Sequence, residues 1–289
     1  MRHGVGAFWA GLAGIVLAAT ACGGRVASPA SPLVPYEGPL WIAPAPGVDS
    51  SKDPGAAGRA VDCDVEIVGG TSTTPYTGGE VGDSPEAALQ EGFDEGVWDG
   101  VDEGLQVAAD DDDRVLFVVQ TDGRNKQAVI VRHGPAADGT GAGPDGVAWW
   151  VESWARCDLA EFPPEVARAR NVEVWTDAAG RRVPTTTIVS YPGGDCVPGS
   201  TFLELGIPGR DRSSAGSTAV YVARAGEEYA TFFAEPYRQD VDLPADAVDT
   251  EYDLRGRHLW LSTDRQRAYV GDRAGVELWP RTVQQLACG

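Results

Sequence analysis

Two apolar runs around an Asp-Gly pair constrain the fold more than any other stretch of this chain. The segments RVLFVVQ (residues 114–120) and KQAVIVR (126–132) flank the turn TDGRN, which contains Asp122 and Gly123. Asp-Gly between β-branched runs is a strong hairpin signal, because the favoured two-residue turn needs positive φ at both positions. We therefore expect an antiparallel hairpin here.

The neighbouring segments extend this hairpin into a larger unit. Ser84 is suited to cap a helix that begins at Pro85, and the apolar residues Leu89 and Phe93 lie one turn apart. The segment VAWWVESWARC, residues 147–157, follows a glycine-rich loop and is expected to form a third strand. Residues 61–165 are therefore predicted to form a domain with a helix and an antiparallel β-meander, ending near Pro163-Pro164.

Residues 166–289 are predicted to form a second, mostly β domain. Strands are expected in VEVWTD, RVPTTTIVSYPGG, TFLELG, TAVYVAR and EYATFFAEPY, and then in three short strands within HLWLSTDRQRAYVGDRAGVELWPR. The last three strands resemble one β-propeller blade, but the unit does not recur in the chain, so a small β domain is the better interpretation. The predicted fold class for the whole chain is α+β.

A four-residue repeat, EGFD-EGVW-DGVD-EGLQ, occupies residues 91–106. Its apolar residues share one helical face, but a glycine in each repeat costs about 1 kcal/mol inside a helix. We expect a helix that gives way to an irregular acidic segment. A calcium site is the alternative, although the repeat does not match the EF-hand loop pattern. A solvated acidic surface is the default interpretation.

The beginning of the chain predicts export. Arg2 precedes seventeen uncharged residues, and ATA stands directly before Cys22. This order is typical of a secretory signal peptide, and the junction LAATACGG resembles the lipobox of bacterial lipoproteins. The resemblance implies cleavage after residue 21 and a diacylglycerol on the Cys22 thiol. Simple secretion with Cys22 in a free tail is the alternative. Residues 22–60, rich in Pro, Ala, Ser and Gly, are expected to act as a spacer.

Four cysteines remain besides Cys22. In an oxidising compartment an even number is expected to form disulfides, and four cysteines allow three pairings. We favour Cys63–Cys157 with Cys196–Cys288, because each bond would then close one half of the chain. Metal binding is the rival, but no two of these cysteines have a CxxC-like spacing and the chain has only 3 histidines.

The charge balance excludes several classes of partner. The chain has 23 basic and 43 acidic residues, for a formal net charge of −20. Nucleic acid needs a basic surface that displaces counterions, so no nucleic-acid partner is expected. Direct adsorption to anionic lipid headgroups is disfavoured for the same reason. The membrane is therefore expected to be reached only through the lipid anchor.

The sequence contains few residues suited to catalysis. Outside the signal region, only His133 and His258 are histidines, and each lies at the end of an expected strand beside arginines. Nucleophile-elbow, zinc-helix and phosphate-loop motifs are missing from the sequence. Abundant acids would allow a carboxylate hydrolase, but they single out no pair. We expect no metal and no cofactor, and we favour a protein that is not an enzyme.

The aromatic segment WWVESWAR is the candidate binding surface. Strict alternation along a strand would place Trp150, Glu152, Trp154 and Arg156 on one face. Such a face could bind a glycan or a peptide of the cell envelope. The alternative is that the tryptophans pack on the helix or on the second domain, since large aromatic residues mostly serve cores.

The chain resembles uncharacterised lipoproteins of actinobacteria over most of its length. The resemblance rests on RVLFVVQTDGRNKQAVIVR, on VESWARCD and on the closing LWLS, AYV and VELWPR segments. It implies a two-domain protein anchored outside the cytoplasmic membrane and carries no assigned activity. We therefore expect a non-enzymatic binding or scaffold role at the cell envelope, with an envelope hydrolase as the alternative.

Overall fold

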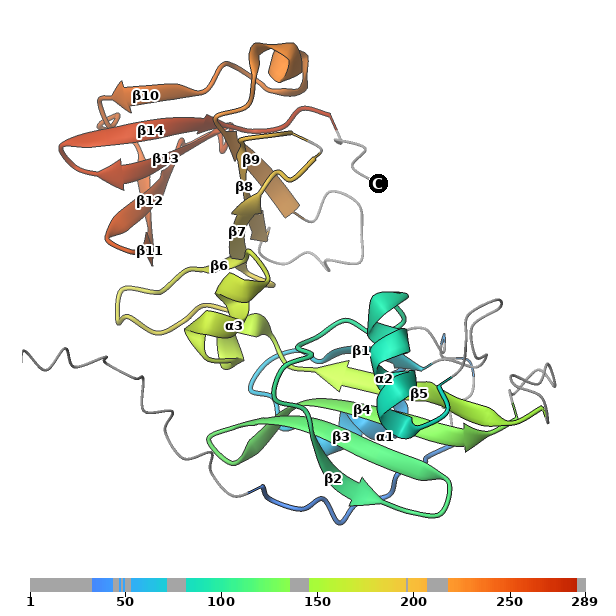
Figure 1. Cartoon of the computed structure of the whole chain (residues 1–289). Helices are drawn as coiled ribbons and strands as arrows, with labels where there is room; N and C mark the ends of the chain where they lie inside the picture. The colour runs from blue at the N-terminus through green and yellow to red at the C-terminus, as the bar shows by residue number, and fades with distance from the viewer. Residues whose placement is uncertain are drawn as a thin grey trace, which may run out of the picture. The chain divides into compact units, whose positions relative to one another are not determined.

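The computed structural model describes residues 33–43, 47, 49, 53–71, 82–135, 146–195, 197–206 and 218–284. These residues form three antiparallel sheets and a few short helices, as the α+β prediction requires (Figure 1). Within these ranges, none of the helices is long and apolar enough to cross a membrane. Cys22, Cys196 and Cys288 lie outside the described residues, so the lipidation site and the second disulfide stay predictions.

The first sheet has five strands in the order β1-β5-β4-β3-β2. Their bounds are β1 Val68–Thr71, β2 Gln106–Asp110, β3 Arg114–Thr121, β4 Arg124–Gly134 and β5 Ala148–Arg156. The predicted hairpin is confirmed: β3 and β4 pair directly, and Asp122 and Gly123 have φ values of 53° and 75°. Positive φ at both positions is the backbone that an Asp-Gly turn favours.

Helices cover both faces of this sheet. On one face, alanines of α1 (Gly55–Ala60) pack with Leu116, Ile130 and other aliphatic side chains. On the other, α2 (Pro85–Asp94) packs with Phe117, Val131 and their neighbours. This double burial explains why β3 reads as a continuous apolar run: successive residues point to opposite faces, and both faces are covered.

The predicted helix cap is confirmed, and two glycines of the four-residue repeat are each required by a different local feature of the backbone. Ser84 Oγ accepts a hydrogen bond from the Ala87 amide at the start of α2. Gly96 follows the helix with φ of 70°, a conformation that terminates helices and suits glycine. At Gly100 a Cβ would lie 2.1 Å from Gln127 Oε1, so the backbone can approach that side chain only without one.

The disulfide Cys63–Cys157 is present, as expected, and joins the segment before β1 to the end of β5. The second part of the expected spacer, residues 22–60, packs on the first sheet and does not act as a spacer. Leu40 is buried against the sheet, and the Tyr36 amide donates to the Ala108 carbonyl. α1 also falls within this range. The small apolar residues of these segments supply the cover that one face of the sheet needs.

The second half contains two more antiparallel sheets. A four-stranded sheet, β6-β7-β8-β9, consists of β6 Glu173–Val174, β7 Ile188–Pro192, β8 Thr201–Gly206 and β9 Thr218–Ala223. A five-stranded sheet, β10-β14-β13-β12-β11, consists of β10 Arg238–Val241, β11 Val248–Leu254, β12 Arg257–Leu261, β13 Arg267–Asp272 and β14 Gly275–Pro280. The closing meander predicted from the sequence is therefore β12-β13-β14.

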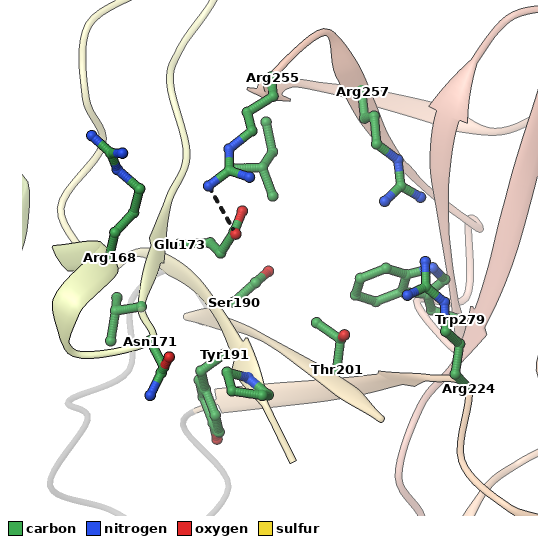
Figure 2. A pocket seen from close by; sticks show the side chains of 13 residues that line it. Arg168, Asn171, Glu173, Ser190, Tyr191, Thr201, Arg224, Arg255, Arg257 and Trp279 are labelled. Atoms are coloured by element: carbon green, nitrogen blue, oxygen red, sulfur yellow. Dashed lines mark ion pairs between the residues drawn. The ribbon is translucent and has the colours of Figure 1, made fainter. Parts of the chain in front are cut away.

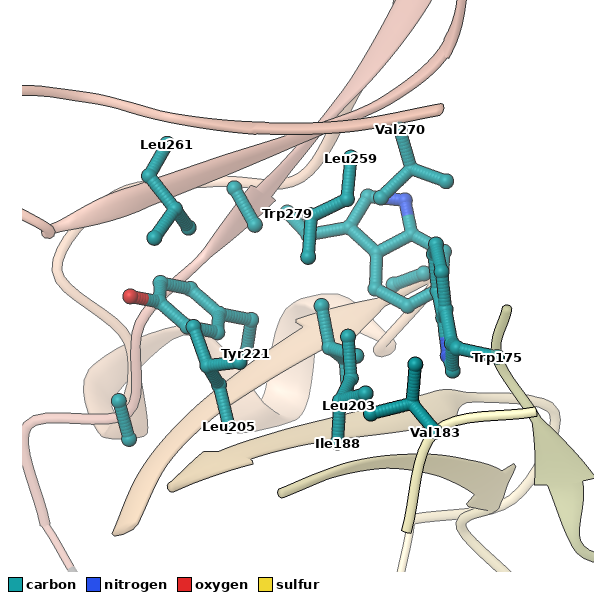
Figure 3. Packing of buried hydrophobic residues seen from close by; sticks show 13 residues of the cluster. Trp175, Val183, Ile188, Leu203, Leu205, Tyr221, Leu259, Leu261, Val270 and Trp279 are labelled. Carbon is teal, nitrogen blue, oxygen red and sulfur yellow. The ribbon is translucent and has the colours of Figure 1, made fainter. Parts of the chain in front are cut away.

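One core joins these two sheets. Ile188, Leu203 and Tyr221 from the four-stranded sheet face Leu259 and other side chains of the five-stranded sheet (Figure 3). Trp175 and Trp279 lie in the same cluster and are almost fully buried. The two sheets thus pack face to face through side chains that alternate inward along each strand.

Among the described residues after β5, three short helical segments connect the strands. The 3₁₀ helix η2 (Leu159–Glu161) and α3 (Pro164–Ala169) lie between the first sheet and β6, next to the expected boundary at residue 165. The strand expected in EYATFFAEPY is wrong: residues Glu227–Phe232 form the 3₁₀ helix η3. The strands of the first sheet all precede residue 165, and those of the other two sheets all follow it. The independence of the two halves stays a prediction.

Candidate functional site

The aromatic segment in β5 does not form the single face expected from strict alternation. The pairing of β4 with β5 shifts between Ile130 and Val131, so that β5 contains one extra residue. Directly opposed residues share a face, and Trp150 opposes Arg132 whereas Trp154 opposes Val129. The bulge therefore places the two tryptophans on opposite faces of the sheet.

The contacts of the four side chains differ accordingly. Trp150 is buried, with the Arg132 guanidinium 6.0 Å from the centre of its ring. Glu152 forms ion pairs with Arg114 at 2.8 Å and with Arg132 at 3.4 Å. Trp154 packs within the cluster next to α2. The remaining side chain, Arg156, binds Asp99 at 2.7 Å. The two tryptophans are therefore packed against neighbouring side chains, and the two charged residues are paired within the fold.

The two histidines lie in different environments. His133 is exposed and contacts the Trp149 ring, with 5.0 Å between ring centres. His258 is half-exposed, with its Nδ1 3.5 Å from Asp253 Oδ2. His258 also lines an open cavity of about 410 Å³ together with Asp177, Asp249, Glu251 and Asp253. A histidine beside a carboxylate in such a cavity is the arrangement that would favour the hydrolase alternative.

Local turns already use most of these carboxylates. Asp249 accepts the Glu251 amide and Asp253 accepts the Gly256 amide, each at 2.8 Å. Asp177 accepts amides of its own turn and pairs with Arg181. The 3.5 Å separation between His258 and Asp253 also exceeds the 2.6–3.2 Å expected of a catalytic hydrogen bond. The acids of this cavity therefore serve mainly to form turns.

The stronger candidate is a cavity of about 430 Å³ with four arginines in its lining (Figure 2). We call it the arginine pocket. Arg168 comes from α3 and Arg224 directly follows β9, whereas Arg255 lies in the turn after β11 and Arg257 begins β12. The rest of the lining includes side chains of β6, β7, β8 and β14, namely Glu173, Ser190, Tyr191, Thr201 and Trp279.

The arginines outnumber the carboxylates that contact them. Arg255 pairs with Glu173 at 3.0 Å. Arg224 and Arg257 share one carboxylate, that of Glu277, at 3.5 and 2.9 Å. In the described structure Arg168 has no ion pair and instead donates to the Pro164 carbonyl. The pocket is therefore a positive region in a chain whose formal net charge is −20.

Glu277 is held in its charged form between the arginines. Burial by itself raises the pKa of Glu277, but hydrogen bonds from Trp279 and Arg257 and the charge of Arg224 bring the pKa below its ordinary value. The carboxylate therefore stays ionised at neutral pH and orients two guanidinium groups. This support fixes the arginines in place, while the shared carboxylate leaves part of their charge uncompensated.

Three of the seven non-glycine residues with positive φ in the described part of the chain line the arginine pocket. Asn171, Arg224 and Arg255 have φ values of 56°, 58° and 55°. Left-handed backbone is uncommon outside glycine and favours Asn or Asp over other side chains. Arg255 and Gly256 form the tight turn between β11 and β12, where Asn-Gly would be preferred. An arginine at that position is disfavoured by the turn itself, and strained residues of this kind cluster at functional sites.

Hydroxyl groups of β7 and β8 add polar character. Ser190 is buried, and its Oγ accepts a hydrogen bond from Trp175 Nε1 at 2.9 Å. The Tyr191 hydroxyl donates to Glu204, and burial together with this hydrogen bond raises the pKa of Tyr191. Tyr191 therefore stays neutral at physiological pH, and its hydroxyl points away from the arginines (Figure 2). Thr201 supplies a further hydroxyl (Figure 2).

Sequence reasoning did not identify this pocket. Its arginines are spread over residues 168–257 and carry no motif, and only the fold brings them together. One local signal was available in LRGR, residues 254–257, where an arginine stands in a turn that prefers Asn before Gly.

The one group of three potential metal ligands found within the described ranges is Cys63, Cys157 and Glu161, and both of its cysteines are joined by the disulfide.

Comparisons with protein-family models, with curated proteins and with solved structures found no match to this chain.

Proposed function

We propose that this chain is a lipid-anchored extracytoplasmic protein that binds a small anionic ligand in the arginine pocket without transforming it. The observation that carries this proposal is the charge imbalance: four arginines line one cavity, and two carboxylates contact them. In a chain with a net charge of −20, such a concentration of uncompensated positive charge favours an anion as the missing partner.

The pocket's chemistry suits a ligand that carries carboxylate or phosphate groups. Planar guanidinium groups match both anions in bidentate geometry. The cavity of about 430 Å³ falls in the usual size range of small-molecule sites. The hydroxyls of Ser190 and Thr201 suit a hydroxylated ligand body. An acidic sugar of an envelope glycan combines both features.

The location rests on the beginning of the chain and on the disulfide. The uncharged run before Cys22 predicts export and lipidation, and the Cys63–Cys157 bond supports an oxidising compartment. Changing Cys22→Ser should release the protein into the medium or leave the signal peptide uncut, as seen by membrane fractionation and intact mass. Normal processing and membrane retention of that variant would contradict the anchor.

The ligand class is tested with defined probes. Calorimetric titration at low salt should detect binding of glucuronate and glucose 6-phosphate, with no binding of neutral glucose. Inorganic phosphate separates recognition of the anion alone from recognition of the sugar body. If neutral glucose binds as well as glucuronate, the proposal of an anion site fails.

Two arginines form a matched pair of test positions. Arg255 and Arg265 both have left-handed backbone and both are exposed, but only Arg255 lines the arginine pocket. Because charge-assisted hydrogen bonds contribute about 1.5–3 kcal/mol, Arg255→Asn should weaken probe binding by roughly tenfold to a hundredfold. Arg265→Asn removes the same charge elsewhere and should leave binding unchanged. Equal weakening in both variants would indicate a general charge effect and overturn the site.

A hydrolase is the second candidate function, favoured by the placement of His258 beside Asp253 in the acidic cavity. A carboxylate hydrolase would use Glu251, whose side chain is exposed there, as its acid or base. The test is release of nitrophenol from a panel of nitrophenyl glycosides and esters. Turnover that is lost in both Glu251→Gln and His258→Ala would establish this candidate over simple binding.

A further inference from the structure

We propose that a second surface, separate from the arginine pocket, binds a protein partner through a segment that combines basic and apolar side chains. The surface is a groove of about 600 Å³ between α3 and the segments 100–104 and 119–121. We call it the α3 groove. Its occupant is inferred from the chemistry of its floor and rim.

The floor of the α3 groove is apolar. Phe93 of α2, Val101 of the segment that follows and Val119 of β3 line one side. Pro163, directly before α3, and Val166 of α3 line the other. Most of these side chains are only partly buried, so their apolar surface stays accessible to a partner. Apolar surface in a groove is a common docking site for side chains of an extended or helical segment.

The rim of the α3 groove is acidic. Asp102, Glu103 and Glu165 are exposed and line the groove. Across the described part of the chain, these three carboxylates make no hydrogen bond or ion pair. The one cation in the lining, Arg170, is engaged by Asp99 and by the Gly100 carbonyl. Glu165 lies near enough to Arg182 to influence its pKa, whereas Asp102 and Glu103 show no such neighbour among the described residues. The rim therefore presents negative charge that is not neutralised by ion pairs there.

The groove is held in place before any partner binds. The buried Gln127 side chain accepts the Val101 amide at 2.6 Å and donates to the Val101 carbonyl at 2.7 Å. Asp99, next to this segment, is bound by both Arg156 and Arg170. These contacts order an otherwise irregular segment, and a preformed surface loses less conformational entropy when it binds.

Charge complementarity selects the occupant. A second copy of this chain also carries a net charge of −20 and would be repelled by the rim. Anionic lipid headgroups are disfavoured for the same reason. A peptide segment with lysine or arginine beside leucine or valine satisfies both parts of the groove, because its cations meet the rim and its aliphatic groups meet the floor.

The probe for this proposal is a ten-residue peptide of alternating leucine and lysine, measured by fluorescence polarisation at physiological salt. The rim variant is Asp102→Asn with Glu103→Gln and Glu165→Gln. The matched control is Asp110→Asn with Asp112→Asn and Glu227→Gln, exposed acids that do not line the groove. Exposed ion pairs contribute about 0.2–1 kcal/mol each, so the rim variant should weaken binding roughly tenfold and the control less than twofold.

A floor variant and a neutral peptide complete the test. Val166→Ser should also weaken binding of the peptide, and a peptide with serine in place of lysine should not bind. Thermal unfolding checks that each variant is folded. Equal loss in the rim and control variants, binding of the serine peptide, or self-association of the chain that Val166→Ser abolishes would each overturn the proposal. Arg255→Asn should leave peptide binding intact, which separates this inference from the proposed anion site.

Discussion

The two halves of the molecule differ in how many acidic partners their basic side chains have. Around the first sheet, most basic side chains are matched by acids: Lys126 pairs with Glu161, Arg124 with two aspartates, and Arg114 and Arg132 with Glu152 and Asp113. Asp99 is an exception, because Arg156 and Arg170 share it. At the arginine pocket, by contrast, three arginines share two glutamates and Arg168 has no ion pair within the described residues. Both regions belong to the same acidic chain, so overall composition does not explain the difference.

This difference separates charges that hold the fold from charges that are available to a ligand. An ion pair that satisfies both partners leaves little field at the surface, whereas an excess of guanidinium groups in a cavity attracts anions. The opposite charge imbalance exists at the α3 groove, where three carboxylates make no ion pair within the described residues. Local charge balance thus points to two binding surfaces of opposite character.

The largest expected effect comes from breaking the disulfide. Cys63 and Cys157 are 94 residues apart in sequence, and in the chain-entropy model the loss of such a cross-link costs about 4.7 kcal/mol. The double variant Cys63→Ala with Cys157→Ala should lower the free energy of unfolding by that amount in urea titrations. If the two halves fold independently, only the transition of the first half should shift. One shared transition would show that the halves unfold as a single unit.

A buried pair and an exposed pair of the first half should also differ. Lys126 and Glu161 are buried and lie 2.7 Å apart. Lys126→Met leaves the Glu161 carboxylate without its counter-charge, so it should cost about 3 kcal/mol. Adding Glu161→Gln should restore part of that loss. Arg124→Met removes more hydrogen bonds, but at an exposed site, and its smaller effect should vanish in 1 M salt.

Sequence reasoning succeeded where local chemistry decides structure. The Asp122-Gly123 turn, the Ser84 cap, the closing meander and the Cys63–Cys157 bond all follow from short-range patterns or from simple pairing arguments. It failed where tertiary packing decides. EYATFF has strand-like composition but forms η3, and the spacer-like alanines of α1 cover a sheet face.

The candidate sites were harder to predict than the fold. One extra residue in β5 places Trp150 and Trp154 on opposite faces of the sheet, and no feature of WWVESWAR predicts that bulge. The arginine pocket assembles side chains from α3, from the residue after β9 and from the turn after β11. Such long-range convergence has no signature in sequence spacing, although the unusual Arg255-Gly256 turn marks one of its members.

The strained arginines allow stability to be separated from binding. Because Asn tolerates left-handed backbone better than Arg, Arg255→Asn and Arg265→Asn should each raise the free energy of unfolding by up to about 1 kcal/mol. Only the first should weaken glucuronate binding. If Arg255→Asn instead destabilises the protein, then the ion pair of Arg255 with Glu173 stabilises the fold. The strained backbone of Arg255 would then no longer support a functional site in the pocket.

The smallest effect concerns the exposed aspartates beside Arg124. Hydrogen bonds from Arg124, with a further contribution from Lys126, lower the pKa of Asp64 to about 2. A carboxyl whose pKa is lower in the folded state stabilises the fold above its unfolded pKa, and this contribution is lost as the pH falls towards 2. NMR titration of the side-chain carboxyl should place the Asp64 midpoint near that value. In Arg124→Gln the midpoint should return towards the ordinary aspartate range, and high salt should move it in the same direction because the pair is exposed to solvent. An unchanged midpoint in Arg124→Gln would mean that Lys126 dominates, and the contrast between buried and exposed pairs in the first half would then need to be redrawn.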